Sequence, residues 1–546
     1  MRFRVLAPPA ILLLSLAASA VRPPAYDVIV RGGTVIDGTG SRRQRADVGI
    51  SGDRIVAVGS LAESTAARVI DATGLIVAPG FIDMLGWSQH TILVDNRGIS
   101  KVTQGITTEI TGEGWSPAPS NERTIAEDSA QFRAWGLTVD WRDLNGYFAR
   151  LEREGLPFNL ATFTGATTLR LYVMGHERRV PRADEMAQME ALLDTAMMQG
   201  SLGLSTALIY EPGSYASTAE LIALARVAQR RGGLYASHIR SEGDGIDRAL
   251  DEAFAIGRGA QIPVEVWHLK LSGRRNWGRM AAIIRRFERE RNAGRRVGAN
   301  SYPYIASATS LSQVLPSWVR AGGAGAMVAR LQLPQVRERI HREVRGASGV
   351  LVLSTVDTTL ARYQGRRISD IARAEGKREL DVVMDLLIAD GGVTGAAFFA
   401  MDERDVTRAV ATEWIGVGSD FGATGPDGVF RGPVHPRAYG TFPRILGRYV
   451  RDLRALSLEA AVHKMTGIPA QRMGLNARGL VREGYFADLV LFDPETVADQ
   501  ATFESTHQVS RGIRYVMVNG RLTMDDGQLT AERPGRPIRG PGWVAP

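Results

Sequence analysis

Short alternating runs of apolar and polar residues mark both ends of the chain. The stretch that begins at residue 26 contains YDVIVRGGTVIDGTG, ADVGISGDRIVAVGS and ARVIDATGLIVAPG, in which Gly and Asp bound runs of Val and Ile. The same pattern returns near the other end, in GYFADLVLFDP and IRYVMVNGRLTMDDGQLT. Alternation bounded by turn residues is typical of β-strands. We therefore predict that residues 21–77 and 476–546 pair into one small β domain that flanks a central body.

The central body, residues 78–475, has a different pattern. Apolar strand-like runs alternate with amphipathic helical stretches, such as 183–199 and 217–231. The eight strand-like runs are GFID, TTEIT, NLATFTGATTLR, GLSTALIY, LYASHIR, VEVWHLK, GANSYPY and WIGVGSDFG. Eight βα repeats favour an α/β fold of the TIM-like (β/α)8 barrel type over an open doubly wound sheet.

One interval is too long for a plain connection between two strands. More than a hundred residues separate Tyr304 from Trp414, and they include a Gly-rich break and the strand-like run VLVLSTVD. We predict that part of this interval, about 310–350, is an insertion near the barrel mouth that can act as a lid.

Composition and charge exclude some classes of protein. The chain has 546 residues, of which 44% are hydrophobic and 23% charged, as in ordinary globular proteins. Its formal charge of +8 comes from scattered basic residues. These do not form the coherent patch that nucleic acids need, so we predict no nucleic-acid partner. The chain has no cysteine, which excludes disulfides and thiol chemistry.

The first twenty residues resemble a signal peptide. Arg2 and Arg4 precede an apolar run from Val5 to Leu16, and the small residues 18–20 follow it. The run is too short to span a bilayer. We expect cleavage after residue 20, export to the periplasm or medium, and no stable membrane insertion afterwards. The alternative is an uncleaved anchor.

Polar side chains end several of the predicted strands. Glu113 follows TTEIT, His238 ends LYASHIR, His268 ends VEVWHLK, and Asp420 ends WIGVGSD. We expect His268 to share an inward face with the two valines of VEV. Strand ends form the active site of such barrels. Two His and one Glu with an open fourth position is a recurring catalytic zinc arrangement.

Asp420 would then act as general base beside a metal held by Glu113, His238 and His268. It would take the proton of the attacking water and pass it to the leaving amine, in metal-assisted hydrolysis of an amide. A lone buried histidine is more often a hydrogen-bonded core residue than a ligand. Two histidines at the ends of consecutive strands, with Asp420 at the end of the eighth, favour the metal site.

Longer motifs give the chain a family resemblance. They are APGFID, QGITTEITGEGWSPAP, YASHIRSEGDG, WHLK, SYPY, GSD, HPRAYGTFPRILGRYV and REGYFADLVLFDP. In this order they resemble the D-aminoacylase, or N-acyl-D-amino-acid deacylase, family of the amidohydrolase superfamily. The resemblance implies a TIM-like barrel, a β-sandwich made from both termini, and zinc-dependent hydrolysis of the amide bond of N-acyl amino acids, D-configured ones among the candidates. It also implies a metal-bound water as the nucleophile.

The chain departs from the family pattern at two points. Members usually carry His-x-His after GFID, where this chain has Leu85 and Trp87. Their usual Cys before the SPAP run is Glu113 here. We therefore expect one divalent metal per site. Zinc is the first choice, and the oxygen ligand leaves manganese, cobalt or iron open.

The small-molecule substrate, an N-acyl amino acid, has its own candidate residues. The resemblance implies that Arg437 binds the substrate carboxylate and that Tyr210 and Tyr302 lie near the substrate. Arg240 and Lys270, each two residues beyond a histidine, are expected to face the pocket and bind anions.

Two further acids are expected to support the metal ligands from behind. Asp83 matches the acid of the first strand in the family, and Glu109 lies four residues before Glu113 on the same strand. At this even spacing both glutamates are expected on one face. A buried Glu109 needs a positive partner, for which Lys101 or an arginine is available.

Other functions stay open from the sequence. A dipeptidase, or an amidase for a bulkier acylated substrate, belongs to the same class. A catalytically inactive binding relative of the fold is a different class, motivated by the absent His-x-His. A serine hydrolase is excluded because no GxSxG motif occurs.

Overall fold

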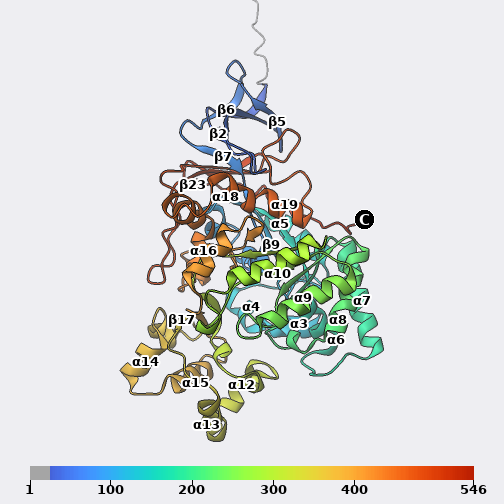
Figure 1. The fold of residues 1–546 in the computed structure, drawn as a ribbon, viewed down its shortest axis with the longest axis vertical. Helices are drawn as coiled ribbons and strands as arrows, with labels where there is room; N and C mark the ends of the chain where they lie inside the picture. The colour runs from blue at the N-terminus through green and yellow to red at the C-terminus, as the bar shows by residue number, and fades with distance from the viewer. Residues whose placement is uncertain (1–24, 546) are drawn as a thin grey trace, which may run out of the picture.

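Strands from the two ends of the chain form a β-sandwich at one end of the molecule (Figure 1). The structure is a computed structural model that describes residues 25–545, so the expected signal peptide lies outside the described residues. One sheet has the order β5 (Arg54–Gly59), β4 (Asp47–Ser51), β1 (Tyr26–Arg31), β6 (Ala66–Asp71). The other has the order β23 (Gln528–Leu529), β22 (Arg521–Asp525), β21 (Ile513–Val518), β20 (Leu489–Phe492), β7 (Ile76–Pro79), β2 (Thr34–Val35), β3 (Gln44–Arg45).

The pairing of β20 with β7 joins the two halves of the sandwich. Leu489 lies opposite Pro79, and the strands run antiparallel. Apolar side chains of both sheets, among them Val48, Val77 and Leu491, form one buried cluster between them. The alternating Val and Ile positions of the sequence are thus explained, because every second residue of a strand faces this core.

Eight parallel strand positions form the barrel below the sandwich. They are β8 (Phe81–Asp83), β9 (Ile106–Thr111), β10 (Asn159–Thr162) with β11 (Thr164–Gly165), β12 (Gly203–Ala207), β13 (Leu234–His238), β14 (Val264–Val266), β15 (Val297–Ser301) and β19 (Ile415–Val417). The ring closes where the N–H of Met84 donates to the carbonyl of Val417 at 3.0 Å. The barrel interior is filled by side chains such as Ile110, Phe163 and Trp267. The predicted barrel is confirmed, with the eight strands expected.

Helices surround the barrel and cover its outer face (Figure 1). Apolar residues of α8 (Thr218–Arg230), α9 (Ile246–Ala260) and α10 (Met280–Asn292) pack with outward-facing residues of the strands in a second large cluster. None of the helices within residues 25–545 has the length and apolar character needed to cross a membrane. The helices outside the insertion are α1 (Ser88–Val94), α2 (Ile99–Val102), α3 (Glu122–Glu127), α4 (Ser129–Trp135), α5 (Leu144–Glu154), α6 (Ala166–Met174), α7 (Ala183–Met198), η1 (Gly213–Tyr215), α8 (Thr218–Arg230), α9 (Ile246–Ala260), η2 (Arg274–Asn276), α10 (Met280–Asn292), α16 (Glu403–Ala411), η5 (Gly428–Phe430), α17 (Arg437–Arg444), η6 (Ile445–Asp452), α18 (Leu458–Met465) and α19 (Gly467–Met473).

The insertion is longer than predicted and has a hydrophobic core of its own. It lies at the end of the molecule opposite the sandwich (Figure 1). Instead of ending near residue 350 it continues to β18 (Gly395–Phe398). This strand pairs with both β16 (Ser307–Ser310) and β17 (Val350–Ser354) and closes a separate sheet. Its elements are β16 (Ser307–Ser310), η3 (Leu311–Val314), α11 (Ser317–Arg320), α12 (Gly323–Leu331), α13 (Pro334–Glu343), β17 (Val350–Ser354), η4 (Thr358–Tyr363), α14 (Ile368–Glu375), α15 (Glu379–Ala389) and β18 (Gly395–Phe398).

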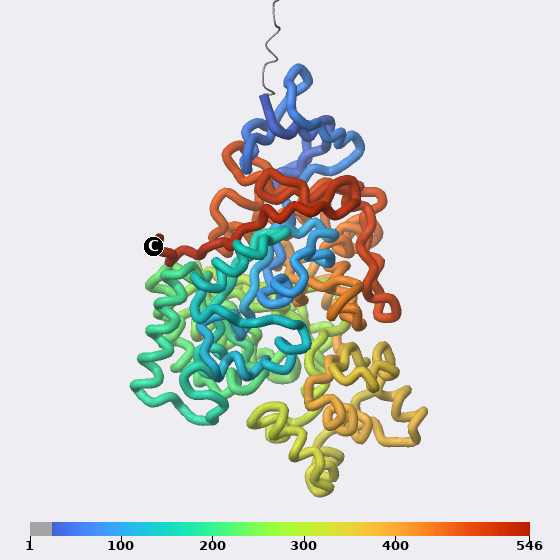
Figure 2. The backbone as a smooth tube through the Cα atoms, turned by 180° about the vertical axis from the view of Figure 1, so that it is seen from behind, coloured from blue at the N-terminus to red at the C-terminus, as the bar shows by residue number. Residues whose placement is uncertain are grey.

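The last described residues leave the sandwich and follow the barrel (Figure 2). Pro534 and Pro537 form bridges with Leu156 and Leu160, beside β10. Further on, Val544 donates its N–H to the carbonyl of Met198 at 2.9 Å. The prediction that all of residues 476–546 belong to the sandwich is therefore wrong for this tail, whose Pro- and Gly-rich sequence has no strand period.

Candidate metal centre

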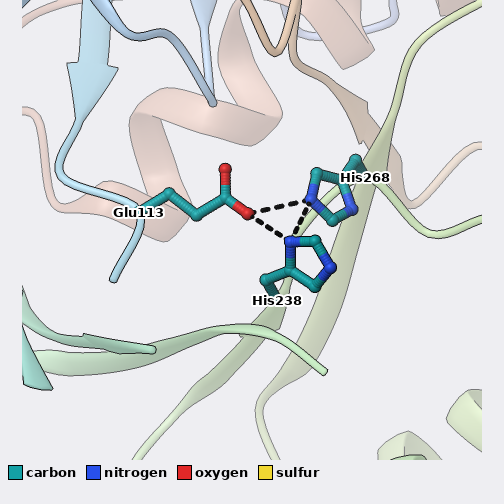
Figure 3. Close-up of side chains that lie close together, drawn as sticks. All are labelled: Glu113, His238 and His268. Atoms are coloured by element: carbon teal, nitrogen blue, oxygen red, sulfur yellow. Dashed lines mark hydrogen bonds and ion pairs between the residues drawn. The ribbon is translucent and has the colours of Figure 1, made fainter. Parts of the chain in front are cut away.

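Three acid and base side chains meet at the carboxyl end of the barrel strands (Figure 3). Oε1 of Glu113 lies 2.6 Å from Nδ1 of His238 and 2.9 Å from Nε2 of His268. The two ring nitrogens are 3.0 Å apart. All three residues are buried. Within residues 25–545 they are the group of His and acidic side chains that is arranged to hold a metal ion.

A turn flanked by glycines delivers Glu113 to this group. Gly112 and Gly114, on either side of it, have φ angles of 95° and 69°, a region that favours glycine. A Cβ at Gly112 would lie 2.6 Å from the carbonyl oxygen of Phe163. Since β9 ends before this turn, the even spacing from Glu109 does not place both carboxylates in one environment. The expected shared face is wrong for this reason.

His268 reaches the group through a local turn, and not through the strand face that the pattern predicted. Val264 and Val266 pack in the outer cluster against the helices. The strand β14 ends at Val266, and His268 has a φ of 34°. Its N–H donates to Oδ1 of Asn300 at 2.8 Å. A non-glycine residue in this region costs about 1–3 kcal/mol and is held by its surroundings, often at functional sites.

Glu242 is a further functional candidate that the pattern of strand ends does not predict. Its Oε1 lies 2.9 Å from Nδ1 of His268 and 3.6 Å from Nε2 of His238. Nζ of Lys270 bonds the same oxygen and lies 2.7 Å from Nδ1 of His268. The carboxylate therefore lies behind both imidazoles, on the side away from Glu113. The available signal was its place in YASHIRSEGDG, four residues after His238.

The charges of the group stabilise one another. Burial would raise the pKa of Glu113, but the imidazoles of His268 and His238 outweigh it, and the pKa is lowered. Burial and the neighbouring ammonium lower the pKa of His268, but three surrounding carboxylates, Asp420 among them, raise it to about 9.

The donor set fits a divalent metal. Three lone-pair atoms lie within 3.0 Å of one another, so an ion at ordinary Zn–N and Zn–O distances can contact all three. Glu242 and Lys270 both contact Nδ1 of His268, so Nε2 is the ring nitrogen that faces Glu113 and His238. The residues that would hold the ion are Glu113, His238 and His268.

Asp420 is held by a hydrogen bond on one oxygen and an ion pair on the other. The indole N–H of Trp87 donates to Oδ1 at 3.2 Å, and the guanidinium of Arg437 pairs with Oδ2 at 2.8 Å. Asp420 has a φ of 52° and is buried. The pairing of Arg437 with Asp420 was not expected from the sequence.

The residues that follow β8 contribute no imidazole to the group formed by Glu113, His238 and His268. Leu85 is fully buried in the barrel interior, and Trp87 faces Asp420. His90 packs against Phe132 and Trp141, with ring centroids 5.0 and 6.3 Å away. Burial lowers the pKa of His90 to about 4.

The two tyrosines predicted to lie near the substrate have different surroundings. Tyr210 packs edge-on against His238 at 5.3 Å and shares a hydrogen bond with Thr309 of the insertion at 2.9 Å. Tyr302 has the guanidinium of Arg437 4.7 Å from its ring centre, and its buried hydroxyl has no hydrogen-bond partner among the described residues.

The two expected anion-binding cations already have carboxylate partners. Lys270 is buried and paired with Glu242. Arg240 pairs with Glu252 at 2.8 Å and donates to the carbonyls of Ser214 and Ala216. Its donors therefore hold a loop, and the structure does not bring Arg240 to the metal group.

Asp83 and Glu109 share the buried ammonium of Lys101. Nζ of Lys101 lies 2.8 Å from Oδ2 of Asp83 and 3.1 Å from Oε2 of Glu109. Ser88 donates its N–H and hydroxyl to Glu109 at 2.9 and 2.7 Å. Gly86 makes room, because a Cβ there would lie 2.1 Å from Oε1 of Glu109. Neither acid contacts the imidazoles, and the positive partner expected for Glu109 is Lys101.

Known proteins are similar to this chain in sequence and fold over most of its length. A model of the amidohydrolase family matches residues 356–524. A D-aminoacylase of Alcaligenes xylosoxydans xylosoxydans is 36% identical over 94% of this chain and 97% of its own length. The structure of an N-acyl-D-glutamate deacylase from Bordetella bronchiseptica, in complex with zinc and a phosphonate that mimics the tetrahedral intermediate, has a TM-score of 0.80 at 36% identity, covering 94% of this chain and 99% of that one.

A third relative bears on the number of metals. It is a D-aminoacylase with a binuclear metal centre that shows one-metal activation and second-metal attenuation. Its structure has a TM-score of 0.80 at 38% identity, covering 94% of this chain and 100% of that one. With these similarities and a buried Glu-His-His group at the barrel mouth, the chain belongs to the D-aminoacylase family of the amidohydrolase superfamily, and is a metal-dependent hydrolase of C–N bonds.

Proposed function

We propose that the protein hydrolyses the amide bond of N-acyl-D-amino acids with a single zinc ion held by Glu113, His238 and His268. The observation that carries the proposal is the convergence of these three buried side chains. The relatives support the substrate class, because they are named for N-acyl-D-amino-acid deacylation. The missing His-x-His supports a single metal.

The residues around the group have distinct roles in this proposal. A bound divalent ion supplies Lewis-acid chemistry, which lowers the pKa of water and polarises a carbonyl. Asp420 takes the proton of the attacking water and returns it to the leaving amine. Trp87 and Arg437 fix the direction of its carboxylate, one on each oxygen. Burial excludes bulk water and strengthens these interactions.

Two unused donors support a substrate with a carboxylate. Nε of Arg437 and the hydroxyl of Tyr302 are both buried, and neither has a hydrogen-bond partner among the described residues. Buried polar groups are rarely left without a partner. A carboxylate accepts hydrogen bonds at both oxygens, so the free carboxylate of an N-acyl amino acid can engage both donors.

The proposal is tested with the purified protein and a panel of N-acetyl-D- and N-acetyl-L-amino acids, with and without added zinc. We expect hydrolysis of the D compounds that requires metal. Asp420→Asn should retain the metal and lose turnover. Full activity of Asp420→Asn would remove Asp420 from its role, and activity that survives removal of all metal would contradict the proposal as a whole.

A further inference from the structure

A buried ammonium braces the turn that carries Asp420. Nζ of Lys101 lies 2.8 Å from Oγ of Ser419 and 2.6 Å from the carbonyl of Phe421, the residues immediately before and after Asp420. Lys101, Asp83 and Glu109 are all fully buried. Neither the proposed chemistry nor the metal group uses this ammonium.

Asp83 also holds this turn, through hydrogen bonds from Ser419. It accepts the N–H of Ser419 at 2.7 Å and also its hydroxyl. It further accepts the N–H of Leu85 at 3.2 Å and a hydrogen bond from the ammonium of Lys101 at 2.8 Å. The N–H of Asp420 donates to the carbonyl of Leu85 at 2.7 Å. Thus the backbone on both sides of Asp420 is tied to one ion pair, and the residue between has its left-handed φ of 52°.

The helix that carries Lys101 is fixed to the same segment. In α2, Ser100 receives a hydrogen bond from the N–H of Thr424 at 3.0 Å and donates its own N–H to the carbonyl of Thr424 at 3.2 Å. Ser88, which binds Glu109, also accepts the N–H of Ala423 at 2.8 Å. The cluster therefore connects the first two barrel strands to residues 419–424.

The ammonium is a fixed positive charge. Burial alone would lower the pKa of Lys101, but the carboxylates of Asp83 and Glu109 outweigh burial and raise it. A cation with two carboxylates, a hydroxyl and a carbonyl around it has all its donors engaged, so it cannot bind substrate as well.

We propose that Lys101 is a positioning residue of the reaction: it holds the turn 419–421 so that Asp420 presents its carboxylate to the water and the amine. The inference rests on the proposed role of Asp420. It predicts a loss of kcat without loss of the metal, because Lys101 contacts none of the metal-binding residues. It further predicts that the effect disappears once the carboxylate of Asp420 is gone.

A charge-matched variant separates positioning from folding. Lys101→Met alone leaves two buried carboxylates without a cation and can prevent folding. The original cluster of Asp83, Glu109 and Lys101 has one net negative charge. Lys101→Met combined with Glu109→Gln keeps that net charge, because only the carboxylate of Asp83 remains. Glu109→Gln alone keeps the ammonium, Asp83 and Ser419 together. Lys464→Met is a matched control, because Lys464 is a buried lysine that donates to the carbonyls of Val410 and Thr412, away from Asp420.

The experiment measures bound zinc, kcat and KM for each variant, and repeats kcat with Asp420→Asn added. We expect the Lys101→Met/Glu109→Gln protein to keep one zinc and its KM while kcat falls by about 100-fold, the loss typical of a displaced catalytic group. Glu109→Gln and Lys464→Met should stay close to the unchanged protein in kcat per metal-loaded molecule. The triple variant should be no slower than Asp420→Asn alone.

Two results would overturn the inference. One is a folded, zinc-loaded Lys101→Met/Glu109→Gln protein with the original kcat. The other is a triple variant in which the two losses multiply, since Lys101 would then act independently of Asp420. If Asp420→Asn itself is fully active, the proposed role of Asp420 fails first. If Asp420→Asn is inactive while the Lys101 variant is active, only the inference fails.

Discussion

The guanidinium of Arg437 forms an ion pair with Oδ2 of Asp420 at 2.8 Å, and both side chains are almost fully buried. Arg437 is the residue predicted to bind the substrate carboxylate, and Asp420 is the residue proposed to carry the proton of the attacking water. The pair also orients Arg437, whose Nε is left without a hydrogen-bond partner among the described residues. In the proposed function, this contact connects carboxylate recognition with proton transfer.

Arg437→Ala should weaken the reaction of free acids far more than that of their amides. A hydrogen bond to a charged group contributes about 1.5–3 kcal/mol, so kcat/KM for an N-acetyl-D-amino acid should fall by about 10- to 100-fold more than for the corresponding amide. The measurement is kcat/KM for the two compounds. Equal losses for both would remove Arg437 from carboxylate recognition and leave only its contact with Asp420.

Trp87→Phe should lower kcat and leave the metal in place. The change keeps an aromatic ring but removes the indole N–H that donates to Oδ1 of Asp420 at 3.2 Å. Loss of one such charge-assisted hydrogen bond corresponds to a decrease of about tenfold or more. Trp277→Phe is the matched control, because its indole donates to the carbonyl of Ala400. An unchanged kcat in Trp87→Phe would show that the indole N–H does not contribute and that Trp87 only fills space.

Glu242→Gln should weaken metal binding. The carboxylate lies 2.9 Å from Nδ1 of His268 and orients the ring so that Nε2 faces Glu113. Loss of such a partner typically costs about 10- to 100-fold in metal affinity. Zinc affinity is measured by competition with a chelator. Glu252→Gln, which removes a partner of Arg240 instead, is the control. An unchanged affinity would show that the carboxylate does not orient His268 for the metal.

Much of the barrel could be predicted from the sequence, because eight apolar runs separated by helical stretches are a long and regular signal. The ends of these runs also selected Glu113, His238, His268 and Asp420. Alternation failed where the strand stopped early: His268 is aimed by its own left-handed turn, and Glu113 by the glycines around it. A period of two says nothing about residues beyond a strand end.

Partners from distant loops were the part that could not be predicted. Glu242 lies in a loop, and its role depends on the fold that brings it behind His238 and His268. Likewise, Arg437 was matched to a substrate carboxylate, but nothing in its sequence neighbourhood indicates Asp420 as its partner. The extent of the insertion depended on the pairing of β18 with β16, which joins residues almost ninety positions apart.

Glu265 predicts a specific dependence of stability on pH. Burial raises its pKa to about 7 from 4.5, although Arg472 opposes the shift. The folded state therefore binds this proton more tightly than the unfolded state, and stability falls as pH rises from about 4.5 to about 7. The full shift corresponds to about 3 kcal/mol. The difference in unfolding free energy between the unchanged protein and Glu265→Gln should decrease by up to this amount between pH 5 and 8. A constant difference would contradict the raised pKa.

The central claim is a single catalytic metal held by Glu113, His238 and His268. The most direct measurement is a titration of the metal-free protein with zinc, in which bound zinc and hydrolysis of an N-acetyl-D-amino acid are followed together, for the unchanged protein and for Glu113→Ala. We predict that activity rises with zinc and saturates at one equivalent per chain, and that Glu113→Ala binds zinc much more weakly. Activity that needs two equivalents, or none, or zinc binding unchanged in Glu113→Ala, would contradict it.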